Sequence, residues 1–329
     1  MRCCFVLAQK GFDKMINYYI TQNGKPEQIE QSQNGCWVSM IAPTEEEVAR
    51  ISTQYSIDPD ALKAALDIDE RSRIETDENY TMILINIPMV EAFTDEKELY
   101  NTLPLSIITV NDVVITVCSQ DTPILHQFTK GKVKDFYTNM KSRFIFQLLY
   151  KIASFYLLYL RVIDRKSEEV EAKLHKSTRN QELIELLKLE KSLVYFTTAL
   201  RSNEVVLEKL VRLESIKKYP DDADLLEDVI VENRQAIEMA NIYSGILSGT
   251  MDAFASVISN NLNIVMKILA VITIVMSIPT MIFSAYGMNL QMCGMPFAQH
   301  PFGFLIIVAI ALGLSAVVAI LFKALKMFR

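Results

Sequence analysis

Oxygen-bearing side chains recur at helical spacing near the end of this 329-residue chain. Steps of four and three residues from Asp252 meet, in order, Ser256, Ser259, Asn263, Met266, Ala270, Thr273, Ser277, Thr280, Ser284 and Gly287. We call this set the polar stripe, because every member is small or polar except Met266. A period of 3.5 residues keeps the set on one face of a helix. Its uncharged oxygens would contact the water shell of a passing ion without stripping that shell away.

Such chemistry suits Mg²⁺, a small hard cation that releases its water reluctantly. The polar stripe can line an aqueous path only if several copies of the helix surround one axis, since two spans cannot enclose such a path. Met266 and Leu269 would then form a hydrophobic constriction near the inner mouth. Helix packing is the alternative, because small residues and hydroxyls are also common where membrane helices touch.

Two apolar segments are long enough to carry this helix across a membrane. Ile264 to Tyr286 contains one charge, Lys267, and Phe302 to Phe322 contains none. Each exceeds the roughly 20 residues that cross a hydrocarbon layer about 30 Å thick. We therefore predict two membrane spans in preference to two buried core helices.

The distribution of basic residues predicts the orientation of these spans. The linker 287–301 has no Lys or Arg, whereas Lys323, Lys326 and Arg329 follow the second span. Basic residues stay on the cytoplasmic side, so both the N- and C-termini are expected in the cytoplasm, with the protein in the cell's inner (plasma) membrane and in contact with its lipids.

The part before the spans is acidic and lacks the motifs of common enzymes. No Asp or Glu follows Asp252, so the first 252 residues carry 39 acidic and 29 basic side chains. This charge disfavours nucleic acid as a partner. We find no GxxxxGK[ST], HExxH or GxSxG pattern and expect no enzyme. Five scattered cysteines indicate free thiols in a reducing compartment.

The acidic part reads as strands and short helices followed by long helices. We expect strands at 37–43, 80–90, 105–110 and 113–118, a helix opened by a capping box at 44–47, and a helix from Pro59 to Leu66. The apolar run Cys3–Ala8 favours another strand. Residues 141–176 and 181–215 are helical in pattern, and Pro220 with residues 221–223 is interpreted as a break.

These elements predict an α+β cytoplasmic domain, long stalk helices and two C-terminal transmembrane helices. The expected domains are a cytoplasmic α/β domain 1–135, a helical hairpin 136–223, a stalk helix 224–286 that includes the span 264–286, an external loop 287–301, a second span 302–322 and a basic tail 323–329.

The sequence Tyr286-Gly287-Met288-Asn289 ends the first span, and Asn263-x-x-Met266-Lys267-x-Leu269 and Pro279 precede it. In these motifs, and in its architecture throughout, the chain resembles the CorA family of magnesium transporters. The resemblance implies a homopentamer with a cytoplasmic funnel, a central pore formed by the first span, and an outer ring of second spans.

The resemblance also implies roles for individual residues. Gly287, Met288 and Asn289 would form the external filter, with the Asn289 amide meeting hydrated Mg²⁺ and Gly287 permitting a sharp turn. The implied pore lining is Asp252, Asn263, Met266, Thr273, Ser277 and Thr280. Our interpretation of the residue pattern adds Leu269 and Ser284 to this lining. Mg²⁺ would be both cargo and regulator, and Asp228 resembles a regulatory metal position.

Two departures from the family's pattern leave alternatives open. The loop 290–296 has no acidic residue, and Lys63 and Ala64 stand where acidic partners of Asp228 are usual. The non-acidic loop, with Cys293 and His300, leaves Zn²⁺, Co²⁺ or Ni²⁺ open as the cargo, as in the zinc-transporting branch of the superfamily. The change at Lys63 and Ala64 leaves open whether Asp67, Asp69 or Glu70 substitutes or the regulatory site is lost. A different class, a membrane-anchored binding or signalling protein that transports nothing, also fits a stripe that serves only to pack helices.

Overall fold

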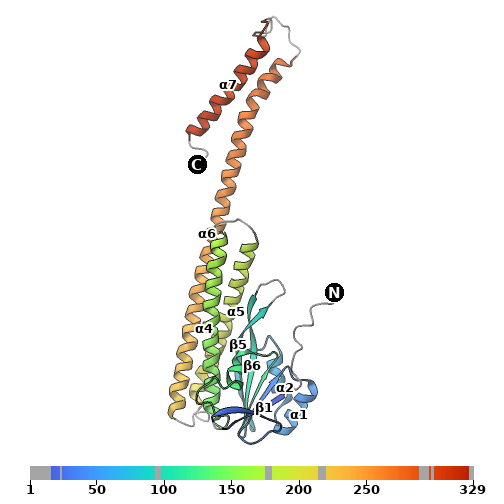
Figure 1. Cartoon of the computed structure of the whole chain (residues 1–329), viewed down its shortest axis with the longest axis vertical. Helices are drawn as coiled ribbons and strands as arrows, with labels where there is room; N and C mark the ends of the chain where they lie inside the picture. The colour runs from blue at the N-terminus through green and yellow to red at the C-terminus, as the bar shows by residue number, and fades with distance from the viewer. Residues whose placement is uncertain are drawn as a thin grey trace. The chain divides into compact units, whose positions relative to one another are not determined.

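The computed structural model describes residues 16–22, 24–92, 98–174, 180–213, 220–288, 296–297 and 300–325. The chain divides into two compact units, Met1–Gly249 and Thr250–Arg329. Helix α6, Pro220–Tyr286, contributes residues to both units (Figure 1). The expected strand at Cys3–Ala8 lies outside the described residues.

The first unit is built on a seven-stranded mixed sheet with the order β2-β1-β3-β7-β6-β5-β4. The strands are β1 Ile16–Gln22, β2 Lys25–Ile29, β3 Trp37–Ile41, β4 Arg73–Thr76, β5 Tyr80–Ala92, β6 Glu98–Val110 and β7 Val113–Cys118. Strands β3 and β7 pair in parallel, and the other neighbours pair antiparallel. The expected strands are confirmed, whereas β1, β2 and β4 were not predicted.

One face of the sheet is covered by short helices: α1 Glu45–Tyr55, α2 Pro59–Lys63 and the 3-10 turn η1 Ala64–Leu66. The predicted capping box is confirmed, because the Thr44 hydroxyl accepts from the Glu47 N–H while the Glu47 carboxylate accepts from the Thr44 N–H at 2.9 Å. These two bonds satisfy donors that the first turn of α1 would otherwise expose.

The opposite face packs against α3, Pro123–Thr129, and α4, Lys141–Leu174, through an aromatic cluster. The ring of Trp37 lies 5.3 Å from that of Phe144 and 6.4 Å from that of Phe128. Its indole N–H donates to the Thr116 hydroxyl at 2.9 Å, so the buried polar atom has a partner. Trp37 is the chain's single tryptophan, and it therefore reports on the folding of this unit.

Helix α5, Asn180–Arg212, is attached to the sheet by the carboxamide of Asn203, which is 1% exposed. Strand β4 begins at Arg73, opposite Leu84, so β4 does not extend as far as Asn86 and the backbone there has no neighbouring strand on that side. The Asn203 carboxamide fills the place: its oxygen accepts from the Asn86 N–H at 2.9 Å, and its nitrogen donates to the Asn86 carbonyl at 2.8 Å. The Tyr156 hydroxyl of α4 donates to the same carbonyl at 2.9 Å.

The first part of α6 packs on α5 and α4 (Figure 1). Leu226, Val229, Ala236 and Ala240 are buried, and the buried Asn233 amide donates to the Leu200 carbonyl at 3.2 Å. Our interpretation of residues 220–223 as a break is wrong. Helix α6 begins at Pro220, four residues before the expected start, because proline at the first helical position forfeits no backbone bond.

The described cysteines of this unit, Cys36 and Cys118, are buried free thiols, as the sequence predicts for those two positions. Burial raises the pKa of the Cys118 thiol to about 11, so it stays protonated and unreactive at neutral pH. Cys3, Cys4 and Cys293 lie outside the described residues.

Three described helices are long and apolar enough to cross a membrane: α4, α6 and α7, Gly303–Ala324. In α4 half of the most apolar stretch is buried inside the protein, against 6% in α6 and 11% in α7. The apolar side chains of α4 are therefore used in the core of the first unit. Those of α6 and α7 remain uncovered, as expected for surfaces that face lipid or other copies of the chain.

Candidate ion pathway

In the second unit the polar stripe lies on the side of α6 that α7 does not cover. The α7-facing side is apolar: Val271 is 3% exposed, and Val275, Ile278 and Ile282 are half-buried. Stripe members Thr273 and Ser277 each stand two residues from members of that side, which is a rotation of about 200° on a helix. Thr273, Thr280 and Ser284 are exposed in the single chain.

Three hydroxyl protons of the stripe are donated to the helix backbone. Thr273 donates to the Leu269 carbonyl at 2.8 Å, Ser277 to the Ile274 carbonyl at 2.8 Å and Thr280 to the Met276 carbonyl at 3.0 Å. A hydroxyl that donates in this way keeps its oxygen lone pairs for outside donors. The exposed side of the stripe therefore presents hydrogen-bond acceptors, which match the protons of water molecules around a cation.

Asp252, Asn263, Met266 and Leu269 lie on the same helix and are all exposed. The two apolar members, Met266 and Leu269, are 57% and 58% exposed. Apolar side chains that are exposed beside hydrogen-bond acceptors are expected to be covered by lipid or by further copies of the helix.

The C-terminal end of α6 is completed by backbone hydrogen bonds from Gly287. The helix ends at Tyr286, and the Gly287 N–H donates to the Phe283 carbonyl at 3.0 Å. The described residues with positive φ do not include Gly287, so the expected role of Gly287 in a sharp turn has no support in its conformation. Met288 is 57% exposed. The third filter residue, Asn289, lies outside the described residues.

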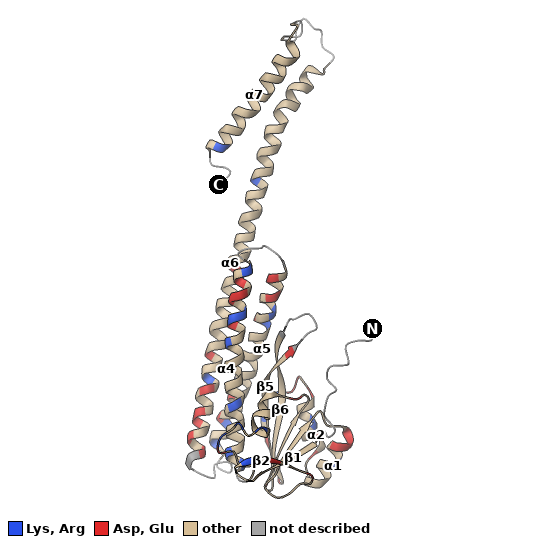
Figure 2. Ribbon diagram, viewed as in Figure 1, with Lys and Arg blue, Asp and Glu red and all other residues tan. Residues whose placement is uncertain are grey.

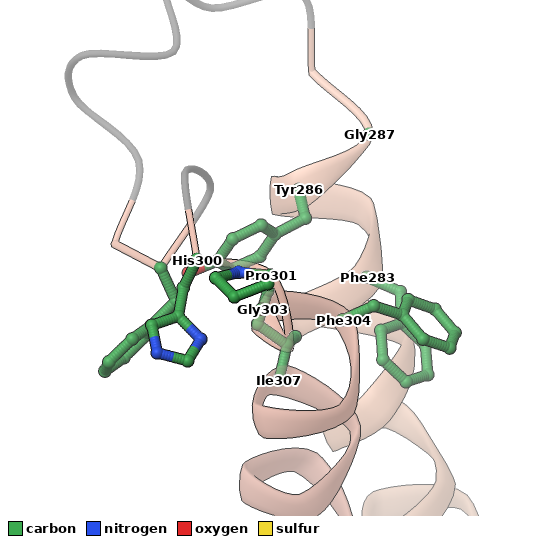
Figure 3. A pocket seen from close by; sticks show the side chains of 9 residues that line it. Phe283, Tyr286, Gly287, His300, Pro301, Gly303, Phe304 and Ile307 are labelled. Carbon is green, nitrogen blue, oxygen red and sulfur yellow. The ribbon is translucent and has the colours of Figure 1, made fainter.

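A cavity of about 570 Å³ lies between the end of α6 and the start of α7 (Figure 3). Its lining is mostly aromatic and apolar: Phe283, Tyr286, Gly287, Phe297, His300, Pro301, Gly303, Phe304 and Ile307. The Tyr286 hydroxyl donates to the Pro296 carbonyl at 2.9 Å, which links the two ends of the loop. The His300 ring Nδ1 accepts from the Phe302 N–H at 3.2 Å, so this nitrogen supports the start of α7.

Gly303 leaves no room for a side chain at this junction. A Cβ atom at this position would lie 2.2 Å from the Phe297 carbonyl oxygen, which is backbone and cannot swing aside. We expect Gly303→Ala to destabilise the hairpin of α6 and α7 by about 1–3 kcal/mol, the usual cost of overpacking. The measurement is the apparent Tm of the full-length protein in micelles. Gly313→Ala is the control, because a Cβ there has no neighbour within 4 Å; equal Tm values for the two variants would contradict this expectation.

The two carboxylates predicted as metal sites belong to different units. Asp228 lies in the first unit and Asp252 in the second, and both are exposed. Within the described ranges, no three His, Cys, Asp or Glu side chains are grouped so that they could hold a metal ion. Lys63 forms an ion pair with Glu45 at 2.7 Å, so its charge has a partner within the same chain.

Charge is confined almost entirely to the first unit (Figure 2). Among the described residues after Asp252, the charged side chains are Lys267 and Lys323. The described part of α6 after Asp252 therefore carries no acidic side chain that could pair directly with a cation.

Sequence reasoning missed one functional contact of this unit, the packing of α7 on α6. Gly303, Ile307, Ala311 and Ser315 are buried at intervals of four residues. Three of these four residues are small, and their spacing was a usable signal for a close helix contact.

The fold and the stripe together define a class of protein: an integral membrane protein with a large α+β domain and two C-terminal spans, the first of which carries an acceptor-lined face. Residues 32–324 match the family described as CorA-like Mg²⁺ transporter protein, and the chain belongs to this family. The predicted fold class is confirmed.

Two related proteins and one solved structure illustrate the relationship. The cobalt/magnesium transport protein CorA of Methanocaldococcus jannaschii is 28% identical over 296 residues, 87% of this chain and 89% of that protein. The protein of the same description from Thermotoga maritima is 25% identical over 295 residues, 85% of this chain and 79% of that one. The complete structure of the CorA magnesium transporter from M. jannaschii matches with a TM-score of 0.79 at 25% identity, covering 94% of this chain and 98% of that one.

Proposed function

We propose that this protein conducts Mg²⁺ across the membrane through a pore formed by the polar stripes of several copies. The observation that carries the proposal is the position of the stripe on the side of α6 opposite α7, where every described member but Ser277 is exposed. In an assembly around one axis, α7 would form the outer layer and the acceptors would face a shared aqueous path. Family membership supports a homopentamer as the assembly.

The stripe and the loop supply different functions in this proposal. Gly287, Met288 and Asn289 form an external filter, and Asn263, Thr273, Ser277, Thr280 and Ser284 contact the water shell of the ion. Met266 and Leu269 form the inner constriction, which stops conduction by excluding water. Asp252 attracts the cation at the inner mouth.

Membrane potential is the proposed driving force. Two charges crossing 100 mV gain about 4.6 kcal/mol, at roughly 2.3 kcal/mol per charge. The proposed setting is the inner (plasma) membrane with both termini in the cytoplasm, which places the basic residues after α7 beside cytoplasmic headgroups. The domain boundaries inferred from the sequence belong to the same proposal, with the start of the stalk helix moved to Pro220.

Regulation by cytoplasmic Mg²⁺ completes the proposal. Bound Mg²⁺ would hold the first units of neighbouring copies together and close the pore, with Asp228 as one ligand. Asp228 is exposed, as a carboxylate available to an adjacent copy must be.

The test is Mg²⁺ uptake into vesicles that contain the purified full-length protein. We expect uptake that increases with an inside-negative potential, ceases when millimolar Mg²⁺ is enclosed, and is absent from protein-free vesicles. Uptake no faster than in protein-free vesicles would leave the anchored, non-transporting alternative as the better account.

Co²⁺ is the second candidate cargo, because two of the related proteins are described as cobalt/magnesium transport proteins. Competition in the same assay separates the cargoes. An excess of Co²⁺ that reduces Mg²⁺ uptake identifies a shared path, and Ni²⁺ and Zn²⁺ are tested alongside. Faster uptake of Zn²⁺ than of Mg²⁺ would contradict the Mg²⁺ assignment.

A further inference from the structure

Pro279 interrupts the hydrogen bonding of α6 in the middle of its outer part. Proline has no N–H, so the Val275 carbonyl, four residues earlier, loses its regular helical donor. The proline ring also crowds that carbonyl and bends the helix. Val275 and Pro279 are both half-buried, on the side of α6 that faces α7.

Ser315 of α7 supplies a hydrogen-bond donor to the Val275 carbonyl. Its hydroxyl lies 3.4 Å from the Val275 carbonyl oxygen and 2.9 Å from the Ala311 carbonyl oxygen of its own helix. One proton serves both acceptors, as in three-centre bonds. Ser315 is 8% exposed and Ala311 is fully buried, so the two helices approach closely here and water is excluded.

The interrupted turn divides the polar stripe. Thr273 and Ser277 precede Pro279, whereas Thr280 and Ser284 follow it. The direction of the later two side chains depends on the angle of the bend. A bend at proline is set by whatever satisfies the freed carbonyl, since the helix itself cannot.

We propose that Ser315 is a positioning residue for transport: by bonding the carbonyl that Pro279 leaves without a donor, it fixes the bend of α6 and so directs Thr280 and Ser284 toward the conduit. The effect on transport rests on the proposed function, whereas the contact between Ser315 and Val275 does not.

A double-mutant cycle tests this directly. Ser315→Ala removes the hydroxyl, and Pro279→Ala returns an N–H to the Val275 carbonyl. In the native background we expect S315A to lower the apparent Tm of the full-length protein by about 2 °C. We expect it to slow Mg²⁺ uptake by about threefold to tenfold, the range for one lost membrane hydrogen bond.

The expected signature is that S315A has no further effect on either quantity in the P279A background. S315T, which keeps the hydroxyl, should retain uptake above that of S315A. Gly313→Ala is the control, because a Cβ there meets no atom within 4 Å. It should neither slow uptake nor lower the Tm, since alanine favours a helix more than glycine does. If P279A does not yield folded protein, P279L supplies the same N–H.

Equal effects of S315A in both backgrounds would overturn the proposal, because Ser315 would then act through packing or through Ala311 alone. A Tm effect with no change in uptake would also overturn it. If no variant transports Mg²⁺, the proposed function fails, but the Tm cycle still decides whether Ser315 compensates for Pro279.

Discussion

Replacing Asn289 by alanine is expected to reduce initial Mg²⁺ uptake by about fiftyfold or more while the protein remains folded. The reason is the repetition of one contact around an axis. In the proposed pentameric filter, the Asn289 amide oxygen of each copy would accept from a water molecule of the hydrated ion, and each such bond would contribute about 0.5–1.5 kcal/mol. Five copies losing the weaker value already forfeit about 2.5 kcal/mol, and about 1.4 kcal/mol is a tenfold change in rate.

Asn261→Ala is the matched control for this prediction. Asn261 stands on the same helix, midway in sequence between stripe members Ser259 and Asn263, so it faces about 200° away from both. It is exposed in the single chain. We expect uptake by N261A to equal that of the native protein. Similar uptake by N289A and N261A would remove Asn289 from the filter.

Replacing Asn203 by leucine is expected to destabilise the first unit by about 2–5 kcal/mol. Leucine matches the size of the side chain but leaves the Asn86 N–H without its partner, and each buried polar group without a bond costs about 1–3 kcal/mol. The Ser72 hydroxyl, which donates to the Asn203 oxygen at 2.8 Å, loses its acceptor as well. Trp37 fluorescence during heating is the measurement, and the Tm should fall by roughly 5–10 °C.

Tyr156→Phe provides the graded comparison. It removes one donor to the Asn86 carbonyl and leaves the Asn203 amide to bond that carbonyl. The expected cost is about 1 kcal/mol. An N203L variant no less stable than Y156F would show that the carboxamide does not act as a substitute for the missing strand.

The helices were predictable because their signals are local. The capping box at Thr44 and Glu47 and the proline at the start of α2 follow from neighbouring residues alone. The same proline rule also applies at Pro220, where we interpreted the acidic residues that follow as a break. They are instead suited to a helix start, since acidic side chains there complement the helix dipole.

The sheet was less predictable because pairing is not local. Strand β2 reads Lys-Pro-Glu-Gln-Ile and has almost no apolar alternation, since it is an edge strand with few buried side chains. The parallel pairing of β3 with β7 joins segments more than 70 residues apart. No local pattern encodes such a contact, nor the substitution of a strand by the Asn203 side chain.

The sequence predicted which face of α6 carries the candidate pathway, but it did not predict the contacts that α7 makes with α6. The period of the polar stripe indicated one face of α6, and the structure leaves most of that face uncovered by α7. The bond between Ser315 and Val275 could not be predicted from the sequence, because it depends on the rotation of α7 against α6. The sequence shows Pro279, but it does not show which residue satisfies the carbonyl that Pro279 frees.

The central claim, that the stripe faces water at membrane depth, is tested by comparing the thiol reactivity of two adjacent positions. Thr273→Cys places a thiol on the stripe, and Ile272→Cys places one at nearly the same depth about 100° away. Both native side chains are exposed in the single chain, Ile272 by 48%. Each variant is made in a background without the native cysteines and with uptake retained.

N-ethylmaleimide is the probe, because it reacts with the thiolate and therefore requires water around the sulfur. In lipid vesicles we predict rapid modification of T273C and little of I272C. Equal rates for the two variants, or faster modification of I272C, would contradict a shared aqueous path along this face of α6.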